Sequence, residues 1–279
     1  MLWEVGMRLR FLVMTIISLF LSAAALQGHS DSLYPVVVGS KYGFCDCSGN
    51  MRIEASYDYV GYFRDGKTAV VGCYNNAGVL LKGIINNDGN LIVPCEFFIT
   101  EGEGMLWGGE DGFYSIENPV SGLIGYYDIR NSFFCEPKYY DVDINVRDKK
   151  GMLVVIDAEN HLSGLIRDST GEPIVECKYL CIYTPNDGLA IGVTEDGYWI
   201  ISSDRKVLKI KDRYIPDNLF QKELLIALIV SENYYCLLNR NGEQMTLSHY
   251  ELIWYDENMG YYVGRLNDKD EIVLIETAR

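Results

Sequence analysis

The sequence predicts an all-β protein built from about six repeats of 34–42 residues. Its 279 residues include 27 Gly and 21 Tyr but only 7 Pro, a composition that favours pleated strands and tight turns over long helices. One pattern also recurs along the chain, because a turn residue is followed eight positions later by an aromatic residue at regularly spaced places. Recurrence of one pattern at a fixed period is typical of a repeat array.

Each repeat is expected to hold two strands joined by a glycine turn, then an aromatic corner and a strand that leads into the next repeat. Five repeats keep this spacing, and in one of them asparagine, which tolerates positive φ, replaces the turn glycine. The structural repeat residues are Gly49 and Tyr57, Gly89 and Phe97, Asn131 and Tyr139, Gly171 and Tyr179, and Gly242 and Tyr250. A sixth repeat is degenerate, with Arg205 at the turn and Tyr214 one position late. We expect the aromatic residues to pack in the seams between repeats rather than to line a ligand cage.

A second turn, with an Asp-Gly pair or an equivalent, closes each repeat before a short apolar strand. Its reference residues are Gly66, Gly112, Gly151, Gly188, Glu223 and Gly260. Further strands are predicted at 34–38 and 271–275, so the repeat is split between the two ends of the domain. Strand exchange between the ends would close a propeller-like ring, which is the favoured arrangement. The same two strands could instead cap an open β-solenoid.

The first 25 residues are predicted to be a secretory signal peptide. Arg8 and Arg10 precede an apolar run, 11–26, in which Ala23 and Ala25 form an A-x-A cleavage pattern. The run has 16 residues, short of the roughly 20 that span a bilayer, so cleavage is favoured over retention as an anchor. Residues 26–33 would then be a linker, and the repeat domain would occupy 34–279. The protein is therefore expected to be exported to the periplasm, the cell surface or the extracellular space.

The charge of the chain argues against two classes of partner. Lys and Arg number 24 against 39 Asp and Glu, a formal net charge of −15. Nucleic-acid binding needs concentrated basic side chains, so no nucleic-acid partner is expected. An acidic protein is also repelled by anionic lipid, so membrane association is expected only if the N-terminal segment is retained.

No metal or other cofactor is expected from the ligand-type residues. The eight cysteines lack the paired C-x-x-C spacing of a zinc site, and the chain has only three histidines. Cys95 and Cys177 each precede a corner aromatic by two positions, a register that favours packed thiols. Asp141, Asp143 and Asn145 resemble the start of a calcium loop, but the loop glycine and the closing glutamate are missing.

The opening repeat, KYGFCDCSGNMRIEASYDYVG, and its later variants IVPCEF and IVECKY resemble the WG-repeat proteins of bacteria. The resemblance extends from residue 34 to about 273. The tryptophan of the Trp-Gly pair is replaced in the pairs Tyr42-Gly43, Lys82-Gly83, Ile124-Gly125 and Ser163-Gly164. The resemblance implies a non-enzymatic β-repeat scaffold without shared catalytic residues.

The function predicted from these observations is that of an exported, non-enzymatic scaffold or binding module. It carries no G-x-S-x-G or H-E-x-x-H motif, and its partner would be another protein or a component of the cell envelope. A carbohydrate-active enzyme is one alternative, because acidic residues are abundant; it would need two carboxyls about 5–10 Å apart. A membrane-tethered sensor is the other alternative, and it requires retention of the apolar segment.

Overall fold

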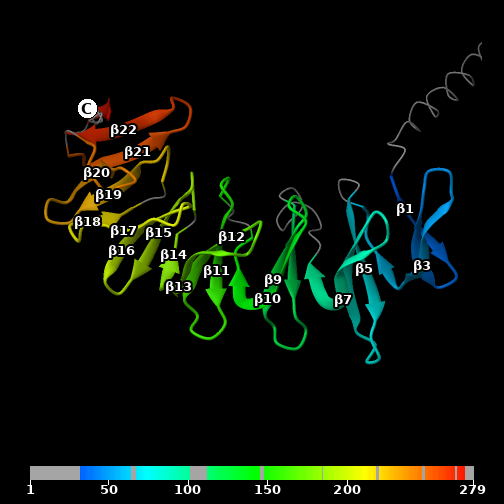
Figure 1. The fold of residues 1–279 in the computed structure, drawn as a ribbon. Helices are drawn as coiled ribbons and strands as arrows, with labels where there is room; N and C mark the ends of the chain where they lie inside the picture. The colour runs from blue at the N-terminus through cyan, green and yellow to red at the C-terminus, as the bar shows by residue number, and fades with distance from the viewer. Residues whose placement is uncertain are drawn as a thin grey trace, which may run out of the picture. The chain divides into compact units, whose positions relative to one another are not determined.

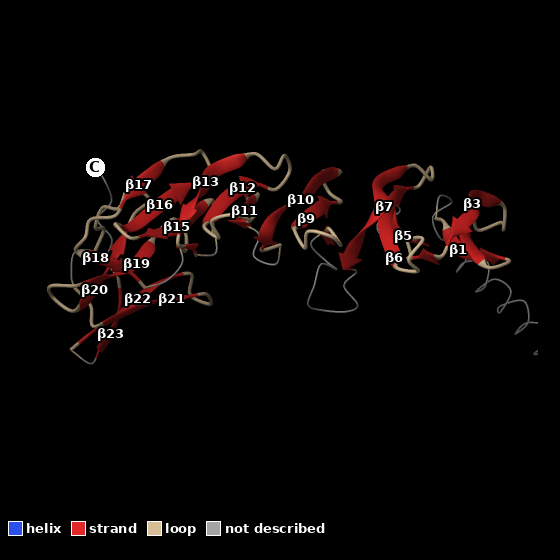
Figure 2. Cartoon of the chain, turned by 90° about the horizontal axis from the view of Figure 1, so that it is seen from below, coloured by secondary structure: helices blue, strands red, loops and turns tan. Residues whose placement is uncertain are grey.

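The computed structural model describes residues 32–63, 67–100, 112–144, 148–183, 185–217, 220–246, 249–267 and 269–273 (Figure 1). These segments form strands, turns and loops (Figure 2), so the predicted all-β class is confirmed. In these ranges, no helix is long and apolar enough to cross a membrane. The predicted signal peptide, residues 26–31 of the linker, Gly66 and Asn145 lie outside the described residues.

The chain divides into two compact regions, Met1–Glu96 and Phe97–Arg279. In the first region, one three-stranded antiparallel sheet contains β1 (Tyr34–Val38), β2 (Lys41–Cys45) and β3 (Met51–Tyr57). The next strands are β4 (Tyr59–Val60), β5 (Thr68–Tyr74), β6 (Leu80–Asn86) and β7 (Leu91–Thr100). The boundary between the regions falls within β7. Strand β1 coincides with the strand predicted at 34–38.

In the second region, β7 is followed by six antiparallel strands in sequence order. They are β8 (Phe113–Glu117), β9 (Ile124–Asp128), β10 (Phe133–Val142), β11 (Met152–Asp157), β12 (Ser163–Arg167) and β13 (Pro173–Tyr179). A four-stranded sheet contains β14 (Cys181–Ile182), β15 (Leu189–Thr194), β16 (Gly197–Ser202) and β17 (Val207–Lys209). Two three-stranded sheets follow: β18 (Tyr214–Pro216), β19 (Leu225–Ile229) and β20 (Tyr234–Leu238), then β21 (Leu252–Asp256), β22 (Tyr261–Leu266) and β23 (Lys269–Ile272). None of the described sheets closes on itself, and the choice between a ring and an open stack stays a prediction.

The aromatic corner is the point at which a strand changes partners. In β10, Tyr139 pairs with Ile124 of the preceding strand and also with Asp157 of the following strand. The register shifts immediately after Tyr139, so the rest of β10 pairs only with the next repeat. Tyr179 likewise pairs with Ser163, and the chain continues into β14, which pairs with β15. At Tyr139 one strand therefore pairs on both of its sides, whereas after Tyr179 the chain passes from one sheet to the next.

Asparagine and aspartate side chains organise the hairpin turns. In the first repeat, Oδ1 of Asp46 accepts hydrogen bonds from the backbone N–H groups of Ser48 and Asn50, both at 2.9 Å. Gly49 then adopts a φ of 81°. The other predicted turn glycines also have positive φ: Gly89 (83°), Gly171 (66°) and Gly242 (69°). These side-chain hydrogen bonds are typical of Asx turns and reverse the chain without help from the core.

The expectation that Asn131 takes the positive φ of a turn glycine is wrong. Positive φ falls on Ser132 instead, at 51°. The turn starts at Asp128, whose Oδ1 accepts the N–H of Arg130 at 2.9 Å, and it is one residue longer than the Asp46 turn. Asn131 uses its side chain as a donor, with 2.6 Å between its Nδ2 and Oδ2 of Asp128.

The hydrophobic core consists of separate clusters that neighbouring repeats share. One cluster combines Leu165 and Tyr179 of β12 and β13 with Ala190 and Ile201 of β15 and β16. Another combines Ile191 of β15 with side chains of β19 and β20. Each repeat thus buries one of its faces against the next repeat, as expected for units too small to hold a core of their own.

The glycine of the Trp-Gly position has a steric role in the first strand of the repeat, the strand before the glycine turn. A Cβ atom on Gly83 would lie 2.5 Å from the carbonyl oxygen of Val93 and 2.9 Å from the backbone nitrogen of Cys95. Both atoms belong to the backbone of the facing strand β7, so neither can move aside like a side chain. Only glycine allows the backbones of β6 and β7 to approach this closely at position 83.

We predict that Gly83→Ala lowers the free energy of unfolding by about 1–3 kcal/mol, because the added methyl group overpacks a backbone contact. Gly72→Ala on the neighbouring strand is the control. There the closest atom to an added Cβ is the flexible Cδ1 of Leu80, at 3.0 Å, so a smaller loss is expected. Urea unfolding of both variants measures the difference. An equal loss of unfolding free energy in the two variants would contradict the claim that the backbone of β7 excludes a Cβ atom at Gly83.

A second prediction concerns the corner aromatics. Tyr250 is 1% exposed and packs against Ile226, Leu237 and Tyr262, so Tyr250→Ala should cost about 3–5 kcal/mol, as other buried aromatic truncations do. Phe97 is half-buried, so Phe97→Ala should lower the free energy of unfolding by less than Tyr250→Ala does. Tyr62→Ala, at a side chain that is 77% exposed, is the control. Thermal unfolding checks the order, and an unchanged midpoint for Tyr250→Ala would refute the seam role.

Candidate functional site

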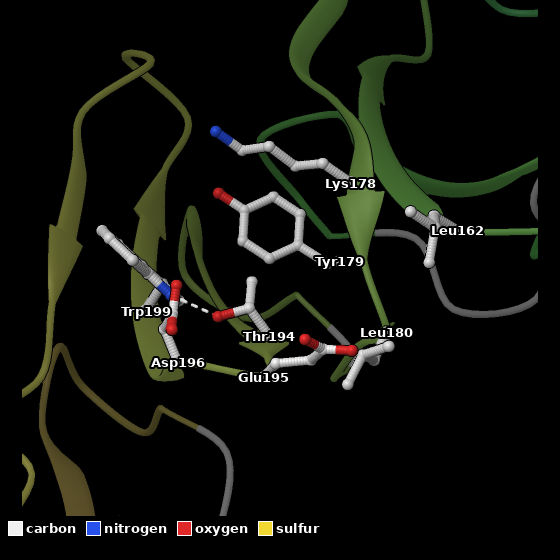
Figure 3. Close-up of a pocket in the computed structure, with 8 residues that line it drawn as sticks. All are labelled: Leu162, Lys178, Tyr179, Leu180, Thr194, Glu195, Asp196 and Trp199. Atoms are coloured by element: carbon white, nitrogen blue, oxygen red, sulfur yellow. Dashed lines mark hydrogen bonds between the residues drawn. The ribbon is translucent and has the colours of Figure 1, made fainter. Parts of the chain in front are cut away.

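A cavity of about 450 Å³ lies between the corner of one repeat and the first hairpin of the next (Figure 3). The corner contributes residues around the end of β13, and the hairpin contributes residues of β15, β16 and their turn. The lining residues are Leu162, Lys178, Tyr179, Leu180, Thr194, Glu195, Asp196 and Trp199. A volume of this size falls within the usual range for small-ligand pockets, roughly 300–1,000 Å³.

The β15–β16 hairpin places two carboxylates at the edge of the cavity. Thr194 pairs with Gly197, so Glu195 and Asp196 occupy the two turn positions, and both are exposed. In Figure 3 the Asp196 carboxylate lies beside Trp199, and the Glu195 carboxylate extends toward Leu180. The place of this turn beside a corner aromatic was not predicted from the sequence.

The indole of Trp199 is fixed by a hydrogen bond inside its own hairpin. Its Nε1–H donates to Oγ1 of Thr194 at 2.9 Å, and the Thr194 hydroxyl donates to the carbonyl oxygen of Gly197 at 3.4 Å. This bond satisfies the only polar group of the indole. The half-buried ring therefore offers an apolar aromatic surface to the cavity.

The opposite wall is formed by Tyr179 and Lys178. The Tyr179 ring lies against Gly192, where a Cβ atom would come within 2.5 Å of its Cδ1, so glycine is required beneath the ring. Burial raises the pKa of the Tyr179 hydroxyl, which remains protonated and able to donate at neutral pH. The Lys178 ammonium lies 5.7 Å from the centre of the Tyr179 ring. The cavity thus combines hydrogen-bond donors, acceptors and apolar surface.

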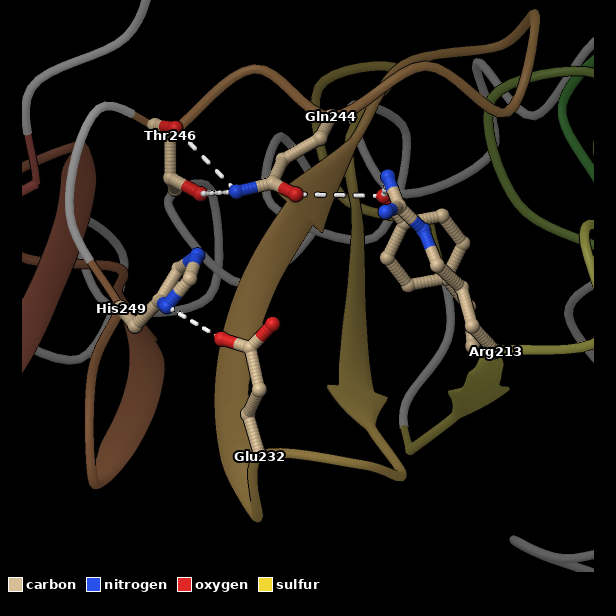
Figure 4. Close-up of polar contacts among 6 residues, drawn as sticks. Arg213, Glu232, Gln244, Thr246 and His249 are labelled. Atoms are coloured by element: carbon tan, nitrogen blue, oxygen red, sulfur yellow. Dashed lines mark hydrogen bonds and ion pairs between the residues drawn. The ribbon is translucent and has the colours of Figure 1, made fainter.

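A second polar cluster lies around the degenerate repeat (Figure 4). The Arg213 guanidinium donates to the Tyr214 hydroxyl, which donates to Oε1 of Gln244 at 3.1 Å. Nε2 of Gln244 donates to Oγ1 of Thr246 at 3.5 Å. Because each of these groups pairs with another residue of the chain, we assign the cluster a structural role: it joins β18 to the segment after β20.

A polar contact between His249 and Glu232 accompanies this second cluster. Nδ1 of His249 lies 2.7 Å from Oε2 of Glu232, and the His249 ring stacks on Tyr234 with 6.3 Å between ring centres. His249 directly precedes the buried corner residue Tyr250. The pair therefore fixes the backbone next to a corner.

The cysteines are free thiols in this structure. Cys135 and Cys236 are buried, whereas Cys47 and Cys181 are exposed, so packing accounts for only part of the set. Burial, together with the neighbouring Cys73 thiol, raises the pKa of Cys95 to about 12. Within the described ranges, no group of three or more His, Cys, Asp or Glu side chains could hold a metal ion.

The predicted repeat residues do not gather at one site. Tyr57, Tyr139, Tyr179 and Tyr250 belong to four different core clusters, and Tyr179 alone among them also lines the cavity. Sequence reasoning missed Trp199, because it lies in the apolar run YWII, where a cavity wall and a core position look alike. One sequence signal could have pointed to Trp199: the Glu195–Asp196 turn follows the corner at Tyr179 and directly precedes the strand that holds Trp199.

Comparisons with known proteins were made for the whole chain. No curated protein matches it. A crystal structure of the eukaryotic initiation factor has 10% identity and a TM-score of 0.35, covering 84% of this chain and 79% of that chain. The acylaminoacyl peptidase of Pyrococcus horikoshii has 12% identity and a TM-score of 0.33, covering 84% of this chain and 49% of that chain. The Dos1 propeller has 10% identity and a TM-score of 0.24, covering 84% of this chain and 72% of that chain.

At TM-scores below 0.5, these likenesses carry no argument about this chain. The family comparison is more specific, because it matches the segments that contain the first two predicted repeats. Residues 42–71 and 83–97 match the family model of the WG containing repeat, which confirms the predicted resemblance in these two segments.

Proposed function

We propose that this protein is an exported, non-enzymatic β-repeat binding module whose ligand enters the cavity beside Trp199. The observation that carries the proposal is the construction of the cavity from two successive repeats, with a fixed indole inside and charged side chains at its edge. Ligand sites of proteins combine apolar walls with a few well-placed polar groups in this way.

Binding without turnover is supported by the placement of the carboxylates. Glycosidases hold two carboxyls on either side of the scissile bond, one to protonate the leaving group and the other to attack or to activate water. Glu195 and Asp196 are instead the two adjacent residues of one exposed turn, and not carboxyls brought together from two separate strands. They are suited to accept hydrogen bonds from a ligand.

Export is supported by the arginines and the apolar run of the first 25 residues. The partner would then be a protein or an envelope component outside the cytoplasm.

We predict that the mature protein begins near residue 26, because small residues precede a cleavage site of this type. Intact-mass measurement of the protein recovered from its native compartment tests this. A mature form that still begins at Met1 or Met7 would contradict export by cleavage and would favour the tethered alternative.

Capture from a native envelope extract tests the binding function. We expect the immobilised protein to retain a component that is eluted with its mass unchanged, and Trp199→Ala to lose it. Trp254→Ala is the matched control, since Trp254 is also half-buried but does not line the cavity. Equal retention by wild type and Trp199→Ala would contradict the site, and conversion of the component into a smaller product would favour an enzyme.

A further inference from the structure

We propose that the cavity beside Trp199 binds a neutral saccharide. The inference rests on the proposed binding function and adds the chemical class of the ligand. Three properties of the lining lead to it: its mixed charge, its fixed aromatic surface, and its balance of hydrogen-bond donors and acceptors.

The charges of the lining are of both signs, with two carboxylates and one ammonium, so an anion is disfavoured and a cation meets both attraction and repulsion. Lys178 would repel a cationic ligand, and Glu195 and Asp196 would repel an anionic one. The formal net charge of −15 for the whole chain adds to the repulsion of anions. A neutral ligand meets neither penalty.

The aromatic surface suits the apolar face of a sugar ring. Because the Trp199 N–H is already bonded to Thr194, the indole does not compete for ligand hydroxyls and offers only its π surface. Leu180, which is 54% exposed, and the half-buried Leu162 extend this apolar wall. In Figure 3 the indole and the Tyr179 side chain lie on facing sides of the cavity.

The polar groups suit ligand hydroxyls, which both donate and accept. The Lys178 ammonium donates, and the carboxylates of Glu195 and Asp196 accept. A ligand with several neighbouring hydroxyls can pair with all of them at once. A purely apolar ligand would leave these groups without partners, which a site built on hydrogen bonds rejects strongly.

Titration calorimetry with defined probes tests the inference. The neutral probes are N-acetylglucosamine, chitobiose, cellobiose, maltose and galactose. The charged probes are trilysine, galacturonate and the zwitterion glycylglycine. We expect at least one neutral sugar to bind, with an affinity that is nearly the same at low and high salt, because neutral ligands are not subject to charge screening.

Variants locate the binding. Trp199→Ala should weaken it at least tenfold, and Trp199→Phe, which keeps an aromatic ring, should weaken it less. Glu195→Gln, at an exposed turn where folding is not at stake, should weaken it severalfold through loss of a charged acceptor. Trp254→Ala should leave it unchanged. Thermal unfolding of each variant confirms that it is folded before it is titrated.

Three results would overturn the saccharide assignment. They are the absence of binding by every neutral sugar, sugar binding that Trp199→Ala leaves intact, and tighter binding of a charged probe. If an extract component is captured through Trp199 while all sugars fail, the binding function stands and only the ligand class is wrong. If neither is captured, the proposed function fails as well.

Discussion

The structure of the second region depends on contacts made at the period of the repeat. Oδ2 of Asp148, in the turn that closes one repeat, accepts the N–H of Gly188, in the closing turn of the next repeat, at 3.0 Å. The Asp187 carboxylate then accepts the N–H of Lys222 at 3.1 Å, and the Lys222 ammonium donates to the carbonyl oxygen of Gly260 at 2.8 Å. Each turn is thus held by its neighbour, so a single repeat lacks the partners it needs.

The same dependence explains where the candidate site lies. The cavity beside Trp199 needs a corner from one repeat and a hairpin from the next, so it exists only when two repeats pack in register. Tyr179 contributes to both features, since its buried ring fills the shared cluster while its side chain also forms a cavity wall. Binding and stability are therefore coupled at this corner and at Trp199, which packs against the same cluster, whereas the exposed Glu195–Asp196 turn can be altered with a smaller effect on the core.

Much of the fold could be predicted because its signals are local. An Asx residue before a glycine closes a turn through its own hydrogen bonds, as Asp46 does, and needs no distant partner. The shift of positive φ from Asn131 to Ser132 shows the limit of this reasoning. There the length of the turn depends on how Asp128 is bonded, which spacing alone does not reveal. The candidate site could not be predicted, because Trp199 meets Tyr179 only through the packing of two repeats.

The sequence by itself determined the all-β class, the repeat period and the turn and corner positions, since these follow from residue type and spacing along the chain. Tertiary structure decided which of the repeated aromatic side chains is only part of the core and which also lines a cavity. Tyr250 is sealed in a core cluster, while the equivalent Tyr179 also borders a cavity. The physical reason is that burial and cavity formation depend on the side chains that other strands bring to the seam, and spacing along the chain does not show which side chains those are.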